Sequence, residues 1–160
     1  MHTYNSNINT DFTCKHCGRF VSAHPAVSGV VNRNHCPYCL YSQHLDLFEA
    51  GDRLCACKGL MAPVGLTTKQ SRDKYAMNGS GELMVVHRCT NCGKLSINRA
   101  AADDDPKKIL DSLERANFFP DLRDNCRQSG IQLLENTSLH LVRTRLFGAE
   151  HELSPAYHAY

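Results

Sequence analysis

The chain has 160 residues, of which 42% are hydrophobic, so it has room for one folded domain, alone or with an appendage, and is not disordered throughout. No apolar run approaches the roughly 20 residues of a membrane-spanning helix, and the first residues lack the basic and apolar regions of a signal peptide. We therefore expect a cytoplasmic protein with no membrane partner. The formal net charge of +2 is too small to attract nucleic acid by itself.

Short strands are predicted in the first two thirds of the chain. Phe12, Phe20 and Val21 flank a Cys-x-x-Cys pair and favour strands, and residues 40–48 predict a further short strand. Residues 67–81 are polar and rich in Gly, Ser and Lys, which indicates a mobile loop. The clearest strand covers residues 83–88, and residues 94–99 return as its hairpin partner.

Helices are predicted after residue 103. Asp103-Asp104-Asp105-Pro106 is typical of a helix start, because acidic side chains suit the positive end of the helix dipole and Pro suits the first turn. Ile109, Leu113 and Ala116 then share one face. A second helix is predicted between about residues 120 and 130, and residues 139–147 fit either a last strand or a helix.

Eight of the nine cysteines form close pairs, which are Cys14/Cys17, Cys36/Cys39, Cys55/Cys57 and Cys89/Cys92. Disulfides are disfavoured in a reducing compartment, whereas two tight turns with two thiolates each suit a tetrahedral zinc ion. A thioredoxin-like reading would need a strand–helix–strand context that no pair has. The ninth cysteine, Cys126, lies in a predicted helix, and we interpret it as a small apolar residue or an exposed thiol without a catalytic role. We expect zinc to organise a core too small to stand alone.

Two zinc ions is the simplest count. The first site would use Cys14, Cys17, Cys36 and Cys39, with 18 residues between the pairs, a length that fits a zinc ribbon. The second would use Cys57, Cys89 and Cys92, with Cys55 or His87 as the fourth ligand. The spacing also allows a cross-brace, in which the first pair joins the third and the second joins the fourth, as the less favoured alternative.

Metal binding changes the charge. Deprotonation of eight thiols adds eight negative charges, and two Zn²⁺ ions add four positive charges, so the formal net charge of +2 becomes −2. With His87 in place of Cys55 the net charge becomes −1. Residues 1–100 hold eleven Lys and Arg against six Asp and Glu, while residues 101–160 hold seven against ten. The cysteine-rich part is therefore the more basic half, which supports a local basic face and not a strong overall field.

The string Arg33-Asn34-His35-Cys36-Pro37, followed by Cys39 and the spaced Ser42, His44 and Asp46, resembles the bacterial RNHCP domain family. Further matches follow in order: Phe12-Thr13-Cys14-x-x-Cys17-Gly18, Gly51-Asp52-Arg53, Cys57-x-Gly59-x-Met61, Gly81-Glu82, His87-x-Cys89-x-x-Cys92-Gly93 and Asn98-Arg99-x-Ala101-x-Asp103-Asp104. The resemblance covers residues 12 to about 106 and implies a small zinc-binding domain, but no activity. It also implies a single cysteine at the position of Cys57, which favours His87 over Cys55.

These observations predict a small α+β fold, with two zinc-ribbon or knuckle β modules followed by a helical C-terminal segment. We expect a flexible lead-in over residues 1–11, a double zinc-ribbon domain over 12–105, a mainly helical extension over 106–149, and a tail over 150–160.

The leading functional hypothesis is binding of structured RNA, on the ribosome or in translation. Phosphates would meet Arg33, Arg88, Lys94 and Arg99, and bases or 2′-hydroxyls would meet Asn34, Tyr38 and Asn98. The first alternative is a protein–protein adaptor that uses the C-terminal segment as its interface. The second is a metal-dependent nuclease with His35 or His44 as base, His44 being paired with Asp46 on one strand face. No nucleophile accompanies that pair, so no catalytic residue is assigned.

Overall fold

A computed structural model describes residues 10–31, 33–48, 52–69 and 81–148. The N-terminal part holds strands β1 (Phe12–Thr13) and β2 (Phe20–Val21), a short helix α1 (Pro25–Ser28) and strand β3 (Ser42–Gln43). The expected strand over 40–48 is thus only two residues long. The sheet continues with β4 (Leu60–Lys69), β5 (Glu82–Cys89) and β6 (Leu95–Arg99).

After β6, the regular elements of the described chain are all helical. They are α2 (Pro106–Arg115), the 3₁₀ turn η1 (Ala116–Phe118), α3 (Leu122–Gln128), the 3₁₀ turn η2 (Asn136–Ser138) and α4 (Leu139–Phe147). The ambiguous stretch 139–147 is therefore a helix. Among the described residues, no helix has the length and apolar character needed to cross a membrane.

The described strands form two antiparallel sheets. β1 pairs with β2, and the larger sheet has the order β3-β4-β5-β6. The hairpin of β5 and β6, with Val86 opposite Ile97, confirms the clearest sequence prediction. β4 begins before the loop expected over 67–81 and runs through its first three residues, because Thr67 and Lys69 pair with Met84 and Glu82 on β5. The rest of that loop, apart from residue 81, lies outside the described residues.

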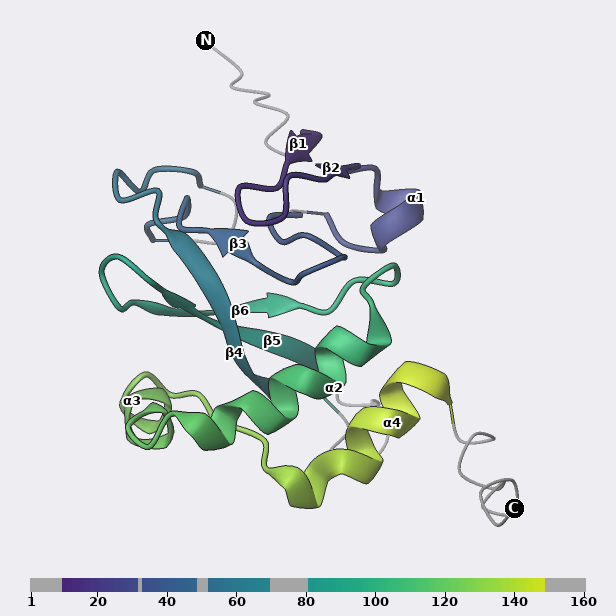
Figure 1. The fold of residues 1–160 in the computed structure, drawn as a ribbon, viewed down its shortest axis with the longest axis vertical. Coiled ribbons are helices and arrows are strands. Elements are labelled where there is room, and N and C mark those ends of the chain that lie inside the picture. Colours follow the sequence, from purple (N-terminus) through teal and green to yellow (C-terminus); the bar gives the residue numbers. More distant parts are fainter. Residues whose placement is uncertain (1–9, 32, 49–51, 70–80, 149–160) are drawn as a thin grey trace, which may run out of the picture.

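The helical segment shares its core with the sheet. In Figure 1, α2 lies across the sheet and α4 lies beside α2, while the cysteine-rich N-terminal part occupies the opposite end of the molecule. One buried cluster joins Leu66 and Val85 of the strands to Ile109, Leu113 and Val142 of the helices. A second cluster joins strands β4 and β5 to α3 through Cys126, which is fully buried and thus acts as a small apolar residue and not as an exposed thiol.

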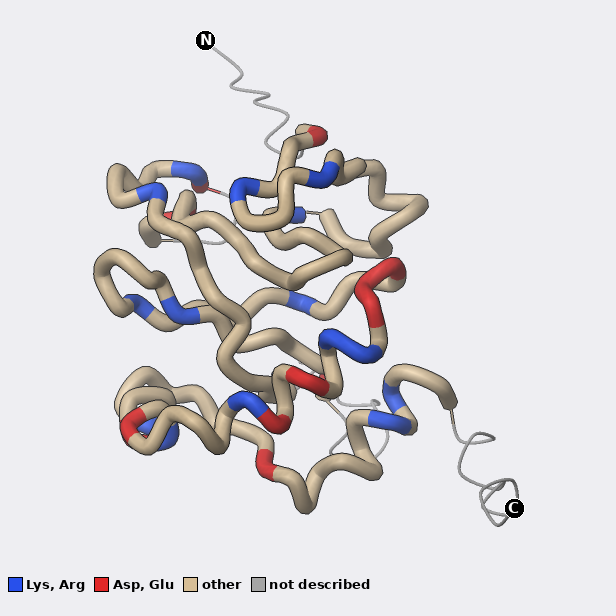
Figure 2. The backbone as a smooth tube through the Cα atoms, in the orientation of Figure 1, with Lys and Arg blue, Asp and Glu red and all other residues tan. Residues whose placement is uncertain are grey.

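The start of α2 corrects one expectation. Asp105 caps the helix, because its side chain accepts a hydrogen bond from the Lys107 N–H, and Pro106 occupies the first turn. Asp103 and Asp104 were expected to act in the same way. They lie before the cap, and their carboxylates bind the N-terminal part instead. Figure 2 shows this acidic run just before α2, beside the N-terminal part.

Candidate metal centres

The first cluster contains the four expected cysteines, Cys14, Cys17, Cys36 and Cys39, with all sulfur atoms within 4.8 Å of one another. The Sγ atoms of Cys14 and Cys39 are 3.6 Å apart, as are those of Cys17 and Cys36. A tetrahedron with zinc–sulfur bonds of about 2.3 Å has edges of about 3.8 Å, whereas a disulfide bond is about 2.05 Å long. All nine cysteines are free. The cluster thus has the dimensions of a thiolate metal site.

Three Cys-x-x-Cys turns share one backbone pattern. In each turn the N–H of the first cysteine donates to a carbonyl five residues later, and its own carbonyl accepts from the residue after the second cysteine. All six N···O distances are 2.8–2.9 Å. Written as N–H donor to carbonyl acceptor, the bonds are Cys14 to Arg19 and Gly18 to Cys14 in the first turn, Cys36 to Tyr41 and Leu40 to Cys36 in the second, and Cys89 to Lys94 and Gly93 to Cys89 in the third. The residue after the second cysteine has a positive φ each time, which explains the glycines at 18 and 93.

Leu40 stands where the other two turns have glycine. Its φ is 63°, a conformation that costs a branched side chain free energy, yet its side chain is fully buried in the main core. The Leu40 carbonyl also accepts a hydrogen bond of 2.6 Å from His87 Nε2. Core burial and this hydrogen bond therefore hold the turn in place despite the strain.

The second cluster contains His44, Cys57, Cys89 and Cys92. The Sγ atoms of Cys57 and Cys89 are 3.7 Å apart, and Cys92 Sγ lies 3.4 Å from His44 Nδ1. Three thiolates and one imidazole form an acceptable zinc site. The first two cysteine pairs share one cluster, and the last pair belongs to the other. The cysteines are therefore grouped in chain order and not as a cross-brace.

This ligand set corrects the expected one, in which Cys55 or His87 filled the fourth position. Cys55 is buried outside the cluster, and its N–H donates to the Leu45 carbonyl. His87 is fully buried with both ring nitrogens engaged, because Nε2 bonds the Leu40 carbonyl and Nδ1 accepts from the Asn98 amide at 2.9 Å. Burial, together with the nearby His35, lowers the pKa of His87 to about 3, so its imidazole is neutral.

His44 reaches the cluster because the chain after β3 lies against the segment that carries Cys57. The His44 N–H donates to the Gly59 carbonyl, and the Lys58 N–H donates to the His44 carbonyl. In the sequence, the position of His44 close to the second cysteine pair indicates a possible ligand, but we interpret His44 there as the partner of Asp46. Asp46 instead accepts a hydrogen bond from the Arg53 N–H and lies 3.6 Å from the Arg53 guanidinium.

Each cluster contains thiols whose pKa is lowered and thiols whose pKa is raised from the usual value of a cysteine. The Asn91 amide, helped by the Gly59 N–H and by His44, lowers the pKa of Cys57 to about 6. Burial raises the pKa of Cys36 to about 11. A metal ion therefore has to displace a proton from Cys36 at neutral pH, whereas Cys57 is already a thiolate.

The RNHCP string binds the acidic run before α2. Arg33 Nη1 donates to both carboxylate oxygens of Asp103 at 2.8 and 2.9 Å, and His35 Nε2 lies 2.8 Å from Asp104. Both Arg33 and His35 are at most 2% exposed. Neither residue can reach a phosphate or a substrate while these contacts persist. They connect the N-terminal part to the loop that leads into α2.

The other residues expected to contact RNA are divided between the interior and the surface. Asn98 bonds His87, Arg88 lies over the Phe119 ring and 3.5 Å from Asp121, and Arg99 pairs with Glu82 at 2.8 Å. Lys94 and Tyr38 are exposed. Lys94 donates to the Leu47 carbonyl, and Tyr38 carries the Arg19 guanidinium over its ring at 4.7 Å.

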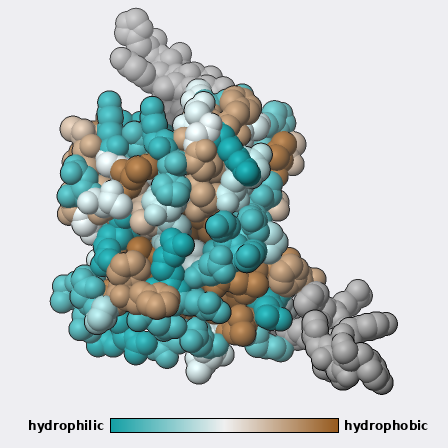
Figure 3. Space-filling model, in the orientation of Figure 1, coloured by the Kyte–Doolittle hydropathy of each residue, from teal (hydrophilic) through white to brown (hydrophobic). Residues whose placement is uncertain are grey.

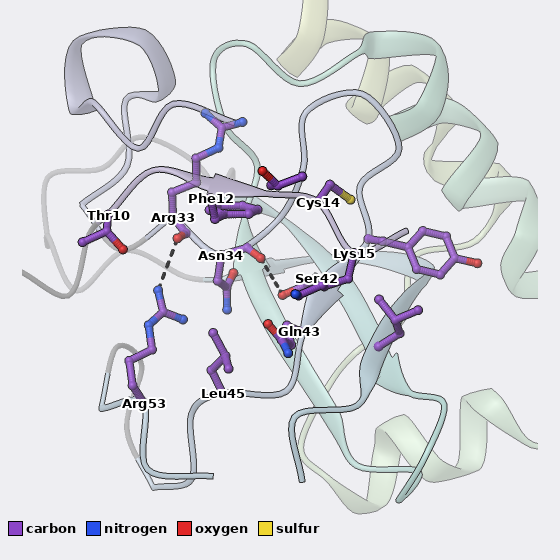
Figure 4. A pocket seen from close by; sticks show the side chains of 13 residues that line it. Thr10, Phe12, Cys14, Lys15, Arg33, Asn34, Ser42, Gln43, Leu45 and Arg53 are labelled. Atoms are coloured by element: carbon purple, nitrogen blue, oxygen red, sulfur yellow. Dashed lines mark hydrogen bonds between the residues drawn. The ribbon is translucent and has the colours of Figure 1, made fainter. Parts of the chain in front are cut away.

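Two cavities adjoin β3. One of about 250 Å³ lies between the first cysteine turn and β3, where Lys15, Asn34 and Arg53 form part of its wall. Figure 4 shows Arg53 donating to the Arg33 carbonyl and Ser42 donating to the Asn34 carbonyl at its edge. The other, of about 150 Å³, is lined by Asn34 and His44 together with Ser96.

In a comparison with protein families, the model described as the RNHCP domain matches residues 9–110. This range contains both clusters and the acidic run. No curated protein and no solved structure matches the chain.

Proposed function

Since this chain belongs to the RNHCP domain family, we propose that its two clusters hold one Zn²⁺ ion each, in a structural role. The observation that carries the proposal is the pair of four-atom ligand sets, each with all its atoms within 4.8 Å. Thiolate and imidazole ligands in this number are those that zinc prefers over calcium or magnesium. Each set would place a zinc-ribbon type of turn around its ion.

The proposed sites are closed. Four protein ligands fill the tetrahedral shell of zinc, so no position remains for a water molecule or a substrate. Bound zinc would act as a cross-link, joining the turn at Cys14 to the turn at Cys36, and β3 to the β5–β6 hairpin. We therefore propose a binding module and do not propose a metal-dependent nuclease.

Metal counting tests the two-zinc proposal. The purified full-length protein should contain two zinc ions by native mass spectrometry and elemental analysis. His44→Ala should hold one, because the second cluster keeps only three ligands. Cys55→Ser is the matched control and should still hold two. The assignment would be contradicted by fewer than two zinc ions in the wild type. It would also be contradicted if Cys55→Ser lost a zinc ion while His44→Ala kept both.

We further propose that the module binds structured RNA through the face of the first cysteine turn. Lys15 and Arg19 are exposed on this turn, and Tyr38 of the Cys36 turn is exposed beneath the Arg19 guanidinium. The stacked Arg19 and Tyr38 present a flat, positively charged surface that suits an unpaired base beside a phosphate. His16 stacks on Tyr41 at 3.6 Å between ring centres, which stiffens the same turn. This surface replaces Arg33, Arg88, Asn98 and Arg99 as the proposed contact, because Arg33 is buried and the other three side chains already contact His87, Asp121 or Glu82.

A crosslinking experiment in cells tests this proposal. The triple variant Lys15→Ala, Arg19→Ala, Tyr38→Ala should recover much less RNA than the wild type, and less ribosomal material on sedimentation. The matched control changes two exposed arginines and an exposed aromatic ring on the helical side, Arg123→Ala, Arg127→Ala and Phe118→Ala. Equal RNA recovery from both triples, or partners that survive nuclease treatment unchanged, would favour the protein-adaptor alternative.

A further inference from the structure

Two buried polar atoms on different segments have no hydrogen-bond partner in the described part of the chain, and both belong to residues that line one cavity. They are Nε2 of His44 and Oδ1 of Asn34, which have no hydrogen-bond partner among the described residues. Both residues line the cavity of about 150 Å³ beside the second cluster. An unsatisfied buried polar atom destabilises a folded protein, so two such atoms in residues that line one cavity require an explanation.

The two atoms have complementary chemistry. His44 directs Nδ1 to the cluster, 3.4 Å from Cys92 Sγ, so a metal-bound imidazole would carry its proton on Nε2 and act there as a donor. Asn34 Oδ1 is an acceptor. Histidine ligands of zinc nearly always donate this second N–H to a carboxylate, a carbonyl or a water molecule, which fixes the ring and increases its basicity.

The position of Asn34 suits this role. The Asn34 backbone carbonyl accepts a hydrogen bond of 3.0 Å from the Ser42 hydroxyl, which holds the Asn34 backbone beside β3. Ser42 lies two residues before His44 in the chain. Figure 4 shows its side chain pointing away from the Arg33 guanidinium and toward Leu45, which lines both cavities. The smaller cavity has room for a few water molecules at about 30 Å³ each and offers further polar partners in Ser96 and Asn98.

We propose that Asn34 is a positioning residue for the second metal, and that an ordered water molecule in this cavity joins its Oδ1 to the Nε2–H of His44. The Asn of the RNHCP string then supports the second metal, while Cys36 of the same string binds the first and Arg33 and His35 bind the acidic run. The pentapeptide thereby links both metal sites. This inference rests on the proposed binding of metal by the second cluster.

Cadmium-113 NMR provides the test, because four thiolates and three thiolates with one imidazole give separate resonances. Cd²⁺ is loaded into the full chain, and a chelator is added while both resonances are followed. Asn34→Leu, which keeps the size but removes the acceptor, should weaken binding at the His44 cluster by about tenfold or more and leave the first cluster unchanged. Asn34→Asp should restore it, because an oxygen acceptor returns.

The control is Gln43→Leu, the same amide-to-leucine change at another residue that lines this cavity, whose amide bonds the Lys58 carbonyl instead. It should leave both resonances unchanged. The His44 Nε2–H proton should exchange slowly with solvent in the wild type and in Asn34→Asp, and rapidly in Asn34→Leu. A greater loss at the first cluster, which contains the neighbouring Cys36, would overturn the proposal, as would a failure of Asp to restore binding. Two cadmium resonances in the wild type would uphold the two-metal assignment in either case.

Discussion

Arg33 and His35 stabilise the protein from inside. Their side chains are buried, and both are directed at carboxylates about seventy positions away in the chain. A buried guanidinium needs such partners, because an unpaired charge in the interior is costly. The residues that give the family its name thus have a structural reason for their chemistry that involves no ligand.

Replacing Arg33 by Ala should lower the free energy of unfolding by about 3–5 kcal/mol, because the change leaves Asp104 buried without its full set of partners. The matched control is Arg99→Ala. Arg99 also pairs with an acid at 2.8 Å, but both partners are about half exposed, so its loss should cost less than about 1 kcal/mol. Urea denaturation of the zinc-loaded proteins measures both values. Similar losses for the two variants would show that the Arg33 contacts contribute no more than a surface pair.

At the scale of the elements, the second cluster depends on a tight approach between β4 and the turn at Cys89. A Cβ atom added to Gly59, just before β4, would lie 2.7 Å from Asn91 Cβ and 2.9 Å from Cys89 Sγ. Gly59 therefore allows the segment that carries Cys57 to reach the turn. Neither neighbour is the end of a flexible side chain that could move aside.

Gly59→Ala should weaken metal binding at the His44 cluster selectively, because the displaced Asn91 also donates to Cys57 Sγ at 3.3 Å. Gly65→Ala is the control. Its added carbon would meet the Leu133 Cδ1 methyl at 2.6 Å, which can rotate away and touches no ligand. Chelator competition monitored by native mass spectrometry measures the release of each ion. A variant at Gly59 that keeps both metals as firmly as Gly65→Ala would argue against this packing constraint.

Elements that depend on neighbouring residues could be predicted from the sequence, whereas contacts between distant segments could not. The turn at Cys14, the hairpin of β5 and β6, and the helix that begins at Pro106 were predictable, because each is determined by residues close together in the chain. The role of His44 was not, because it depends on β3 meeting the segment around Gly59. Asp103 and Asp104 were assigned to the adjacent helix for the same reason, since their partners lie near residue 33.

At the scale of the whole molecule, apolar packing is unevenly distributed. Two clusters join the sheet to α2, α3 and α4, and they include Leu66, Val86, Ile109 and Leu122. The cluster around the first metal site is small and consists of Val21 and two cysteines, with Phe12 and Cys39 against it. On the face shown in Figure 3, apolar residues gather mainly in the lower half, where the helices lie in Figure 1. The expectation that zinc organises the entire core therefore applies best to the N-terminal part.

Removal of zinc should accordingly unfold the protein in two stages. With a chelator present, hydrogen exchange should become fast in β1, β2 and the turn at Cys36, where thiolate–metal bonds replace a hydrophobic core. The amides of β4 and β5 next to Leu66 and Val85 should stay protected, because their packing against α2 requires no metal. The His44→Ala variant, loaded with zinc at the first site alone, serves as the control and should keep β1 and β2 protected. If every amide lost protection together on chelation, the metal sites and the helical core would form one cooperative unit, and the two-stage prediction would be wrong.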